Sequence, residues 1–463
     1  MARTVTGYTR QDQVIQAAPM ATPARRIAAE VLLRVEEDGA FANLALDAAL
    51  RQAGVLEPRE AALATELSYG TLRWQIELDR ALVEHSDKAI DALDAPARVV
   101  LRLAAYELLH HPLVPERAAV NEAVELVKEL KLSRAAGFVN AVLRRVAETR
   151  AAPEPPSRET DPVGNIAARF AHPRWMVERF IKWLGPDEAE KLCQANQQQA
   201  PATVRVRRGA RERALQALAP YDPRPGRYSP DALVLSGAPP ALDIEGHEEG
   251  LFQAQDEAAQ LVSIYAAPSA GANVLDACAA PGGKACHLAE MSRSVLAVDR
   301  HARKTQQIAE AARRLGLSNV EARAADVALP LPGVEPHSFD LVLLDAPCSG
   351  LGTLRRHPEA KLRRTPAEVD ELAQLQSRLL ASVQRYVKRG GLLVYAVCTL
   401  TPEECDEQVD RFLKSFSHFQ LEGPPPGWQH ADCLDSRGRL RTLPHRTGTD
   451  GFYAARFRSG DSP

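Results

Sequence analysis

The sequence has 463 residues, of which 45% are hydrophobic and 25% are charged, proportions that are ordinary for globular proteins. A chain of this length exceeds one hydrophobic core and should divide into about three domains. No apolar run approaches the roughly twenty residues of a membrane span, and the N-terminal residues lack the apolar core of a signal peptide, so we expect a cytoplasmic protein without a membrane partner.

The charge and the cysteine content narrow the class further. A net charge of −3 argues against a wholly basic surface, although a local basic patch is enough to bind phosphates. The seven cysteines are odd in number and include no Cys-x-x-Cys pair, which suits neither a disulfide framework nor a zinc site. We therefore expect free thiols and no metal.

The N-terminal third is predicted to be helical. Residues 1–21 are polar and without periodicity, so we expect a disordered tail there. From Ile27 onward the apolar residues recur at helical spacing, as at Ile27, Val31 and Val35. This pattern predicts an all-α bundle over residues 22–150, with a scaffold or binding role.

A linker and a small mixed segment follow the bundle. Residues 151–165 are rich in Pro, Glu and Ser, which is typical of a linker. Residues 166–250 combine an amphipathic helix with a strand-like run, Val204 to Arg208, and are expected to form an α+β segment. One interpretation makes this run a nucleic-acid backbone contact, and the other makes it a solvated edge strand. The candidate RNA-binding residues are Arg205, Arg207 and Arg208.

Residues 251–463 have the pattern of a Rossmann-like α/β domain. Five apolar runs are expected to be strands, and they cover 274–277, 295–299, 320–324, 339–345 and 392–397. Their alternation with helices predicts a parallel sheet covered on both faces, with its chemistry at the carboxyl ends of the strands. The residues at that edge are Asp276, Asp299, Asp326, Asp345, Cys348 and Cys398.

The first strand runs into a turn that is suited to ligand binding. The run Asp-Ala-Cys-Ala-Ala-Pro-Gly-Gly-Lys ends at Lys284, and Gly282 and Gly283 would let the backbone approach a ligand closely. Asp299 follows the second strand, where nucleotide-binding folds place the carboxylate that binds ribose hydroxyls. A plain Pro-Gly-Gly turn is the alternative.

Two cysteines and a basic cluster stand after later strands. Cys348 lies in Asp-Ala-Pro-Cys-Ser-Gly and Cys398 in Ala-Val-Cys-Thr-Leu-Thr-Pro. A single apolar cysteine is usually buried and inert, but two at strand ends are hard to explain by packing. The basic cluster is tied to the same edge and could hold an anionic substrate. Its candidate residues are Arg355, Arg356 and Arg364.

With these motifs the sequence resembles the S-adenosylmethionine-dependent RNA cytosine-C5 methyltransferases, in particular the bacterial 16S ribosomal RNA group called Sun or Fmu. The resemblance covers nearly the whole chain, and it implies a helical domain similar to the antitermination factor NusB, with S-adenosylmethionine as cofactor and 16S ribosomal RNA as partner. Val397 departs from the family, which commonly has Thr before the nucleophile.

The resemblance also implies roles for the strand-end residues. Asp299 would bind the ribose hydroxyls, Asp326 would lie by the adenine, and Cys398 would be the nucleophile. Asp345 would also border the cofactor. The rest of the cofactor pocket would be lined by Cys278, Ala279, Ala280, Pro281, Gly282, Gly283 and Lys284.

The expected reaction gives the two cysteines different tasks. Cytosine C5 is a poor nucleophile, so a thiolate must first add at C6, which makes C5 reactive toward the methyl group. Asp345, if held protonated, could donate a hydrogen bond to N3, although it could instead only cap its turn. Cys348 could assist the release of the product.

Three other functions are compatible with part of the pattern. An oxidoreductase using NAD would share the sheet, but the turn lacks Gly-x-Gly-x-x-Gly and the cysteines would be idle. An RNA-binding assembly factor with an inert methyltransferase domain would need only the helical module and the basic clusters. A methyltransferase acting on transfer RNA or on another ribosomal site is the third. We expect the protein to be a monomer.

Overall fold

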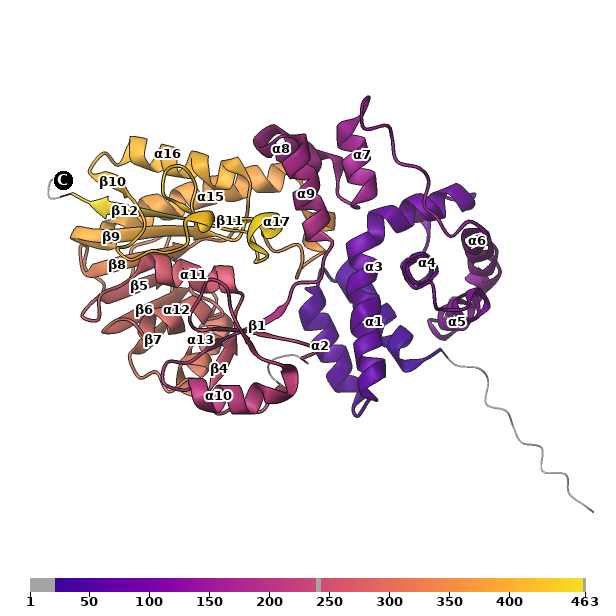
Figure 1. The fold of residues 1–463 in the computed structure, drawn as a ribbon, viewed down its shortest axis with the longest axis horizontal. Coiled ribbons are helices and arrows are strands. Elements are labelled where there is room, and N and C mark those ends of the chain that lie inside the picture. The colour runs from indigo at the N-terminus through magenta and orange to yellow at the C-terminus, as the bar shows by residue number, and fades with distance from the viewer. Residues whose placement is uncertain (1–20, 239–242, 461–463) are drawn as a thin grey trace, which may run out of the picture. The chain divides into compact units, whose positions relative to one another are not determined.

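The computed structural model describes residues 21–238 and 243–460, so the expected N-terminal tail lies almost wholly outside the described residues. The chain divides into two compact units between Glu154 and Pro155, and this division falls inside the range expected to be a linker. Figure 1 shows the first unit in indigo to purple and the second in magenta to yellow. None of the described helices has the length and apolar character that crossing a membrane requires.

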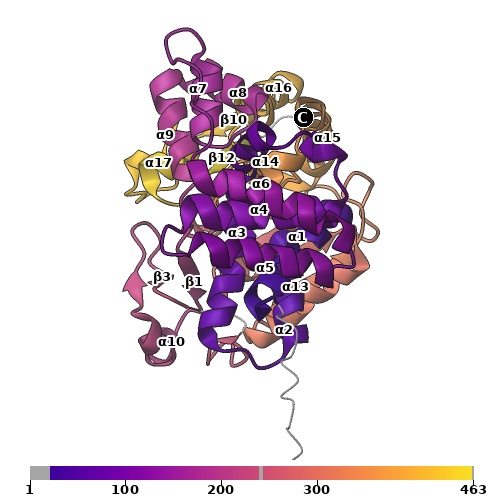
Figure 2. The ribbon, with the colours of Figure 1, turned by 90° about the vertical axis from the view of Figure 1, so that its right-hand side faces the viewer.

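The first unit is helical throughout its described residues, as expected. Its central helix is α4, which is buried along most of its length and packs against α1, α3, α5 and α6 (Figure 2). The periodic residues Ile27, Val31 and Val35 of α1 are all buried, which explains the helical spacing in the sequence. The elements are α1 (Pro23–Glu37), α2 (Ala42–Ala53), α3 (Pro58–His85), η1 (Ile90–Ala92), α4 (Ala95–His110), α5 (Glu116–Glu129), η2 (Ser133–Ala135) and α6 (Ala136–Thr149).

The second unit begins with three helices, α7 (Pro162–Arg169), α8 (Arg174–Leu184) and α9 (Pro186–Asn196). Helix α7 starts within the range that the sequence suggested as a linker. Buried side chains of these helices share a core with Leu351 and Leu400, which stand shortly after the two strand-end cysteines. The three helices therefore support the loops that carry the cysteines.

A small antiparallel sheet follows, which confirms the expected α+β segment. Its strands are β1 (Ala202–Val206), β2 (Arg224–Pro225), β3 (Ala232–Leu235) and β4 (Phe252–Ala254), and the order is β2-β3-β1-β4. The short helices α10 (Arg211–Leu218) and η3 (Ala219–Tyr221) connect β1 to β2. Since β1 pairs with β3 on one side and with β4 on the other, the interpretation of this run as an edge strand is wrong.

The large sheet contains all five strands that the sequence predicted, as parallel neighbours in the order β9-β8-β5-β6-β7. They are β5 (Asn273–Ala277), β6 (Ser294–Asp299), β7 (Val320–Ala324), β8 (Phe339–Asp345) and β9 (Val387–Val397). The sheet is not purely parallel, which corrects the expectation. Beyond β9 lie β12 (Phe452–Ser459) and β10 (Phe419–Glu422), both antiparallel to their neighbours, and β11 (Leu440–Thr442) pairs with β12.

Helices cover both faces of this sheet. Alternate residues of β8 enter two different cores: Leu341 and Leu343 pack with α11 and α12, and Val342 and Leu344 pack with α15 and α16. The helices are α11 (Glu257–Ala266), α12 (Gly283–Ala289), α13 (Ala302–Arg314), α14 (Ala360–Arg363), α15 (Pro366–Val383), α16 (Asp406–Ser415) and α17 (Pro444–Thr447), with η5 (Gln384–Tyr386), η6 (Pro402–Glu404) and η7 (Ala431–Cys433). Strands β6 and β7 lie on one side of β5, and the later strands β8 and β9 lie on its other side. The order in which strands are added therefore reverses between β5 and β8, and sheets of this kind bind ligands at that position.

Candidate active site

The structure brings the two strand-end cysteines together. Strands β8 and β9 are parallel neighbours with Asp345 opposite Ala396, so the residues that follow them meet at one edge. The Sγ atoms of Cys348 and Cys398 lie 3.2 Å apart, and both side chains are partly buried. Val397, where the family commonly has Thr, is fully buried. The two thiols can therefore act on the same ligand.

The surroundings of Cys348 favour its thiol form. The hydrogen bond to Cys398, and then burial, raise the pKa of Cys348 well above its usual value. A third cysteine at this edge, Cys278, is also poorly suited to attack, because burial raises its pKa to about 12. The arrangement thus places a protonated Cys348 beside the Cys398 sulfur.

An ion pair lies next to the cysteines. Nζ of Lys284 donates a hydrogen bond to Oδ2 of Asp345 at 2.7 Å and lies 4.9 Å from the centre of the Phe452 ring. Burial lowers the pKa of Lys284, but the charge of Asp345 and the hydrogen bond to it outweigh burial, so this pKa lies above its usual value. Cys398 contributes in the same direction. The sequence did not predict that Lys284, at a helix start, would reach the residue that ends β8.

Asp276 occupies the centre of the edge. Its side chain is fully buried in β5, and neither carboxylate oxygen has a hydrogen-bond partner among the described residues. Burial, and then the charge of Asp345, raise the pKa of the Asp276 carboxyl well above its usual value. A buried carboxyl without a partner is costly, which marks the site as one built for a ligand.

The turn after β5 is fixed by the backbone. The N–H of Ala279 donates to the carbonyl of Val298 at 2.9 Å, which fastens the turn to β6. Gly282 has φ +105°, and a Cβ there would lie 3.1 Å from Cα of Ile308, so a larger residue would be strained and crowded. Gly283 and Lys284 then open α12, and the Ala280–Pro281 peptide bond is cis.

Two further carboxylates end β6 and follow β7. Oδ1 of Asp299 accepts the N–H of His301, and Oδ1 of Asp326 accepts the N–H of Ala328, each at 2.9 Å. No hydrogen bond to the second oxygen of either residue occurs within the described part of the chain. Each carboxylate is therefore oriented by one oxygen and can offer the other to a ligand.

The first set of candidate RNA-binding residues, Arg205, Arg207 and Arg208, does not form one exposed face. Arg205 is buried in β1, where its Nη1 pairs with Glu290 at 2.5 Å and its Nε donates to Gln255, so it cannot meet a phosphate at the surface. Arg207 is half-buried and donates to the carbonyl of Gly250, whereas Arg208 is exposed. The acid that pairs with Arg205 lies 85 residues away, which the alternation in the sequence could not indicate.

The members of the second cluster, Arg355, Arg356 and Arg364, also differ in their surroundings. Arg356 pairs with Asp256 and Asp450 at 2.7 Å each. Arg355 is buried and donates to two backbone carbonyls, those of Gly448 and Gln199. Both arginines therefore hold the second unit together rather than facing a substrate.

Arg364 differs from Arg356 in its partners: its ion pair with Glu368 is long, at 3.9 Å, whereas Arg356, with 28% of its side chain exposed, is held by two close acids. The side chain of Arg364 is 32% exposed, and its Nε donates to the carbonyl of Ser349 at 3.0 Å. It thus stands directly behind the loop that carries Cys348, within reach of solvent.

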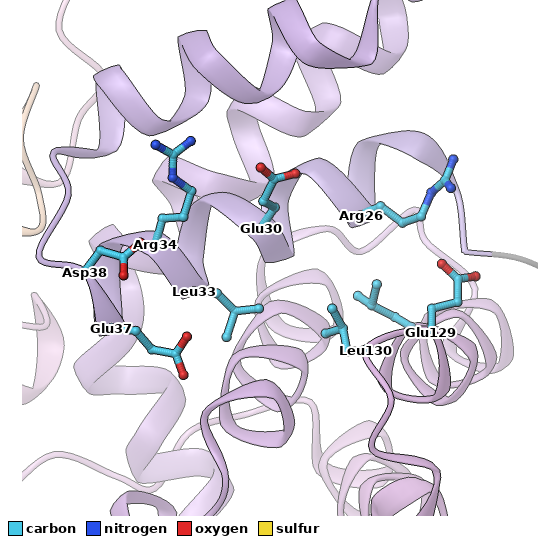
Figure 3. Close-up of a pocket in the computed structure, with 9 residues that line it drawn as sticks. Arg26, Glu30, Leu33, Arg34, Glu37, Asp38, Glu129 and Leu130 are labelled. Carbon is cyan, nitrogen blue, oxygen red and sulfur yellow. The ribbon is translucent and has the colours of Figure 1, made fainter.

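The helical unit carries a hollow of its own. Its volume is about 350 Å³. Figure 3 shows Leu33 and Leu130 between acidic and basic side chains of α1 and α5. It is lined by Arg26, Glu30, Leu33, Arg34, Glu37, Asp38, Leu126, Glu129 and Leu130. It holds neither a cysteine nor an unpaired buried acid, and its mixed charges indicate no particular chemistry.

Comparisons with known proteins cover nearly the whole chain. Residues 263–458 match the family model of the 16S rRNA methyltransferase RsmB/F, residues 22–148 match the NusB family, and residues 172–241 match the ferredoxin-like domain of RsmF/B-like methyltransferases. A probable ribosomal RNA small subunit methyltransferase B of Bacillus subtilis is 35% identical in an alignment of 455 residues, and the match covers 94% of this chain and 99% of that protein.

Another relative and two solved structures are also similar to this chain over most of their own length. Ribosomal RNA small subunit methyltransferase B of Pseudomonas putida is 34% identical over 94% of this chain and 98% of its own. The crystal structure of PH0851 matches 95% of this chain and 99% of its own, with a TM-score of 0.82 and 25% identity. NSun6 from Pyrococcus horikoshii, solved with SFG, covers 63% of this chain and 99% of its own with a TM-score of 0.55 and 21% identity, and shows the same fold.

Proposed function

Since the chain belongs to the RsmB/F family of 16S ribosomal RNA methyltransferases, and is therefore an S-adenosylmethionine-dependent RNA cytosine methyltransferase, we propose that it methylates C5 of one specific cytosine through a covalent adduct with Cys398. The observation that carries this proposal is the 3.2 Å separation of two thiols at neighbouring strand ends. A nicotinamide-dependent oxidoreductase would have no use for this pair.

The residues around β5 and β6 suit the cofactor. The second oxygen of Asp299 can accept from ribose hydroxyls, and Gly282 lets the turn after β5 pass close to Ile308. The carboxyl of Asp276, which has no hydrogen-bond partner among the described residues, lies near the end of β5 and is another candidate contact. In this proposal Asp326 lies beside the adenine, and S-adenosylmethionine supplies an activated methyl group when it is bound.

The covalent step follows from the chemistry of cytosine. Cys398 gives its thiol proton to solvent and its sulfur adds to C6, while the C5=C6 electron pair forms a C4=C5 bond and the C4=N3 pair moves onto N3, so that C5 becomes able to accept the methyl group. Asp345 is the N3 contact in this proposal; the ammonium of Lys284, bonded to Asp345, supplies the proton that N3 takes up, and Lys284 takes this proton back when C5 accepts the methyl group and the C4=N3 bond forms again. The pair thus stabilises the adduct as it forms.

Release is assigned to Cys348. The C5 proton leaves to water, its electron pair restores the C5=C6 bond, and the pair of the C6–S bond returns to Cys398. The S–H of Cys348 can donate to that departing sulfur, which restores the hydrogen bond seen between the two thiols. The raised pKa of Cys348 suits this donor role, because the thiol stays protonated until the Cys398 sulfur leaves C6.

The RNA contacts are proposed from the residues that stay accessible. Arg207, Arg208 and Arg364 are the proposed phosphate contacts, whereas Arg205 and Arg355 are buried and the guanidinium of Arg356 is held by Asp256 and Asp450. The target cytosine must be unpaired or flipped out, because C6 is out of reach within a helix.

The first experiment identifies the substrate. Bisulfite sequencing of ribosomal RNA from cells with and without the protein should show the loss of one 5-methylcytosine in 16S ribosomal RNA. A lost mark in transfer RNA or at another ribosomal site would instead support the alternative substrates, and no lost mark would support an inert assembly factor.

The second experiment separates the two cysteines. Cys398→Ala should abolish methylation and form no protein–RNA adduct, because C5 is never activated. Cys348→Ala should methylate but release slowly, so a denaturation-resistant band should accumulate on gels with labelled RNA and S-adenosylmethionine. The double variant should give no band. The roles are reversed if Cys398→Ala gives the band, and covalent catalysis is wrong if Cys398→Ala still methylates.

A further inference from the structure

A buried carboxylate lies behind the two cysteine loops. Glu404 ends η6 and is completely buried. Its Oε1 accepts hydrogen bonds from the backbone N–H of Ser349 at 2.8 Å and from Nε2 of Gln376 at 3.0 Å. Its Oε2 contacts the hydroxyl oxygens of Ser349 at 2.5 Å, Thr401 at 2.8 Å and Thr399 at 3.1 Å. One carboxylate therefore has five polar contacts.

These contacts join the two loops. Ser349 directly follows Cys348, and Thr399 directly follows Cys398. Their hydroxyl oxygens also lie 2.7 Å from each other, so either can donate to the other while Glu404 accepts from the pair. The positions of both cysteines along the backbone are thus fixed to the same side chain.

Gln376 extends the support to the far side of Cys348. Its Nε2 donates to the carbonyl of Pro347 at 2.9 Å as well as to Glu404. The hydroxyl of Tyr395 contacts Oε1 of Gln376 at 3.0 Å and the backbone carbonyl of Glu404 at 2.7 Å. The side chains of Gln376, Tyr395 and Glu404 are buried, so they form a network away from solvent, and the exposed Pro347 lies at its outer end.

Burying the charge of Glu404 lowers stability unless it is compensated. Its partners are neutral donors, and within the described residues it forms no salt bridge. A buried carboxylate without a cation costs stability unless hydrogen bonds offset the loss of water, and here three of the five contacts come from Ser349 and Thr399, the residues next to the two cysteines. The pKa of Cys348 is raised first by the hydrogen bond to Cys398 and by burial, and the charge of Glu404 adds to this effect.

We propose that Glu404 is a positioning residue that sets the separation of the Cys348 and Cys398 thiols, so that the adduct can both form and resolve. The proposal rests on the proposed function for the roles of the two cysteines. Glu404 itself lies behind the loops, where it touches neither thiol.

Two substitutions and a control test this role. Glu404→Ala removes all five contacts, whereas Glu404→Gln keeps an oxygen for Ser349 and Gln376, and its amide can donate to hydroxyls that turn to accept. Glu257 offers a matched control, because it is also buried and accepts backbone N–H groups, of Tyr228 and Ser229, at the start of α11. Glu257→Ala therefore removes a buried carboxylate that does not contact the cysteine loops.

The first readout needs neither RNA nor cofactor. Diamide takes two electrons and two protons from the two thiols, becomes a hydrazine and leaves a Cys348–Cys398 disulfide, whose rate of formation reports the proximity of the thiols. In the full-length protein Glu404→Ala should slow this reaction by roughly tenfold to 100-fold, Glu404→Gln should recover most of the rate, and Glu257→Ala should leave it unchanged. Peptide mapping identifies the disulfide.

The second readout is methyl transfer. Glu404→Ala should lower kcat with little change in KM for RNA, because the substrate surface is intact, and Glu404→Gln should restore much of kcat. A folded Glu404→Ala that forms the disulfide and methylates at the wild-type rates overturns the proposal. Equal losses in Glu257→Ala overturn it as well.

A further variant covers a failure to fold. If Glu404→Ala does not fold, the double variant Ser349→Ala with Thr399→Val removes only hydroxyls, and it should still slow disulfide formation. Disulfide formation at the wild-type rate in that variant overturns the proposal. If Cys398→Ala still methylates RNA, the proposed function fails, while the disulfide rates still decide the role of Glu404.

Discussion

Arg356 lies between the buried carboxylates of Asp256 and Asp450, so its removal should change stability strongly. Burial, and then the charge of Asp256, raise the pKa of Asp450 to about 6 even with Arg356 in place. A carboxyl whose pKa is raised in the folded state binds its proton more tightly there. Its contribution to stability is therefore greatest at low pH and declines as the pH rises through about 6.

Arg356→Met should reduce the free energy of unfolding by about 3–5 kcal/mol at pH 8, because Asp256 and Asp450 would then face each other without a cation. The loss should be smaller at pH 5, where a proton can replace the guanidinium. Urea unfolding at both pH values measures it, and an equal loss at both would contradict the argument. Arg446→Met is the control, since its exposed pair with Glu188 is worth less than about 1 kcal/mol.

Asp299 gives a second prediction at this scale. Asp299→Ala should weaken S-adenosylmethionine binding by roughly 1.5–3 kcal/mol, the range for a hydrogen bond to a charged group. Calorimetry measures the affinity, and Asp222→Ala, which removes an exposed carboxylate paired with Arg224, is the control. An unchanged affinity would remove Asp299 from the cofactor site.

The loop after Cys348 shows how tightly separate elements meet at the active edge. The N–H of Gly352 donates to the carbonyl of Cys398 at 3.0 Å, and its own carbonyl accepts the N–H of Gly451 at 2.7 Å. A Cβ on Gly352 would lie 2.0 Å from the carbonyl oxygen of Gly451, so no side chain fits without moving the backbone. Gly352 thus joins the loop to the ends of β9 and β12.

Gly352→Ala should therefore separate these elements, with a loss of about 1–3 kcal/mol in stability and a larger relative loss of methylation. Thermal unfolding and a methyl-transfer assay on the same preparation measure the two effects. Gly423→Ala serves as the control, because nothing lies within 4 Å of the added Cβ. Full activity in Gly352→Ala would mean that the loop tolerates a shift.

At the scale of elements, sequence reasoning located the five parallel strands because each is an apolar run with turn residues after it. It missed β12, in which Arg456 and Arg458 alternate with apolar residues and suggest an exposed segment. In the structure Arg456 is buried and pairs with Glu422 of β10. The same cause explains Arg205 and Arg356: partners far along the chain neutralise these arginines, and local patterns do not contain that information.

At the scale of the whole molecule, the two units have separate cores. A fragment of residues 155–463 should fold cooperatively and bind S-adenosylmethionine with the affinity of the full chain, because the carboxylates and the cysteines all lie within it. Its affinity for RNA should be lower and less dependent on salt if the helical unit contributes phosphate contacts. Calorimetry and salt titrations test both statements, and a fragment that cannot bind the cofactor would show that the units depend on each other.

The position of β12 also sets when the enzyme can become active during its own synthesis. Strand β12 is the latest in chain order, yet it lies inside the sheet between β9 and β10, and Phe452 at its start faces Lys284. A nascent chain that has not yet reached Ser459 leaves β9 without its neighbour, and closing this contact over a long stretch of chain is slow. The ribosome must therefore complete β12 before the newly made enzyme can modify ribosomal RNA. Proteins truncated by a stop codon ahead of residue 452 should have no methyltransferase activity.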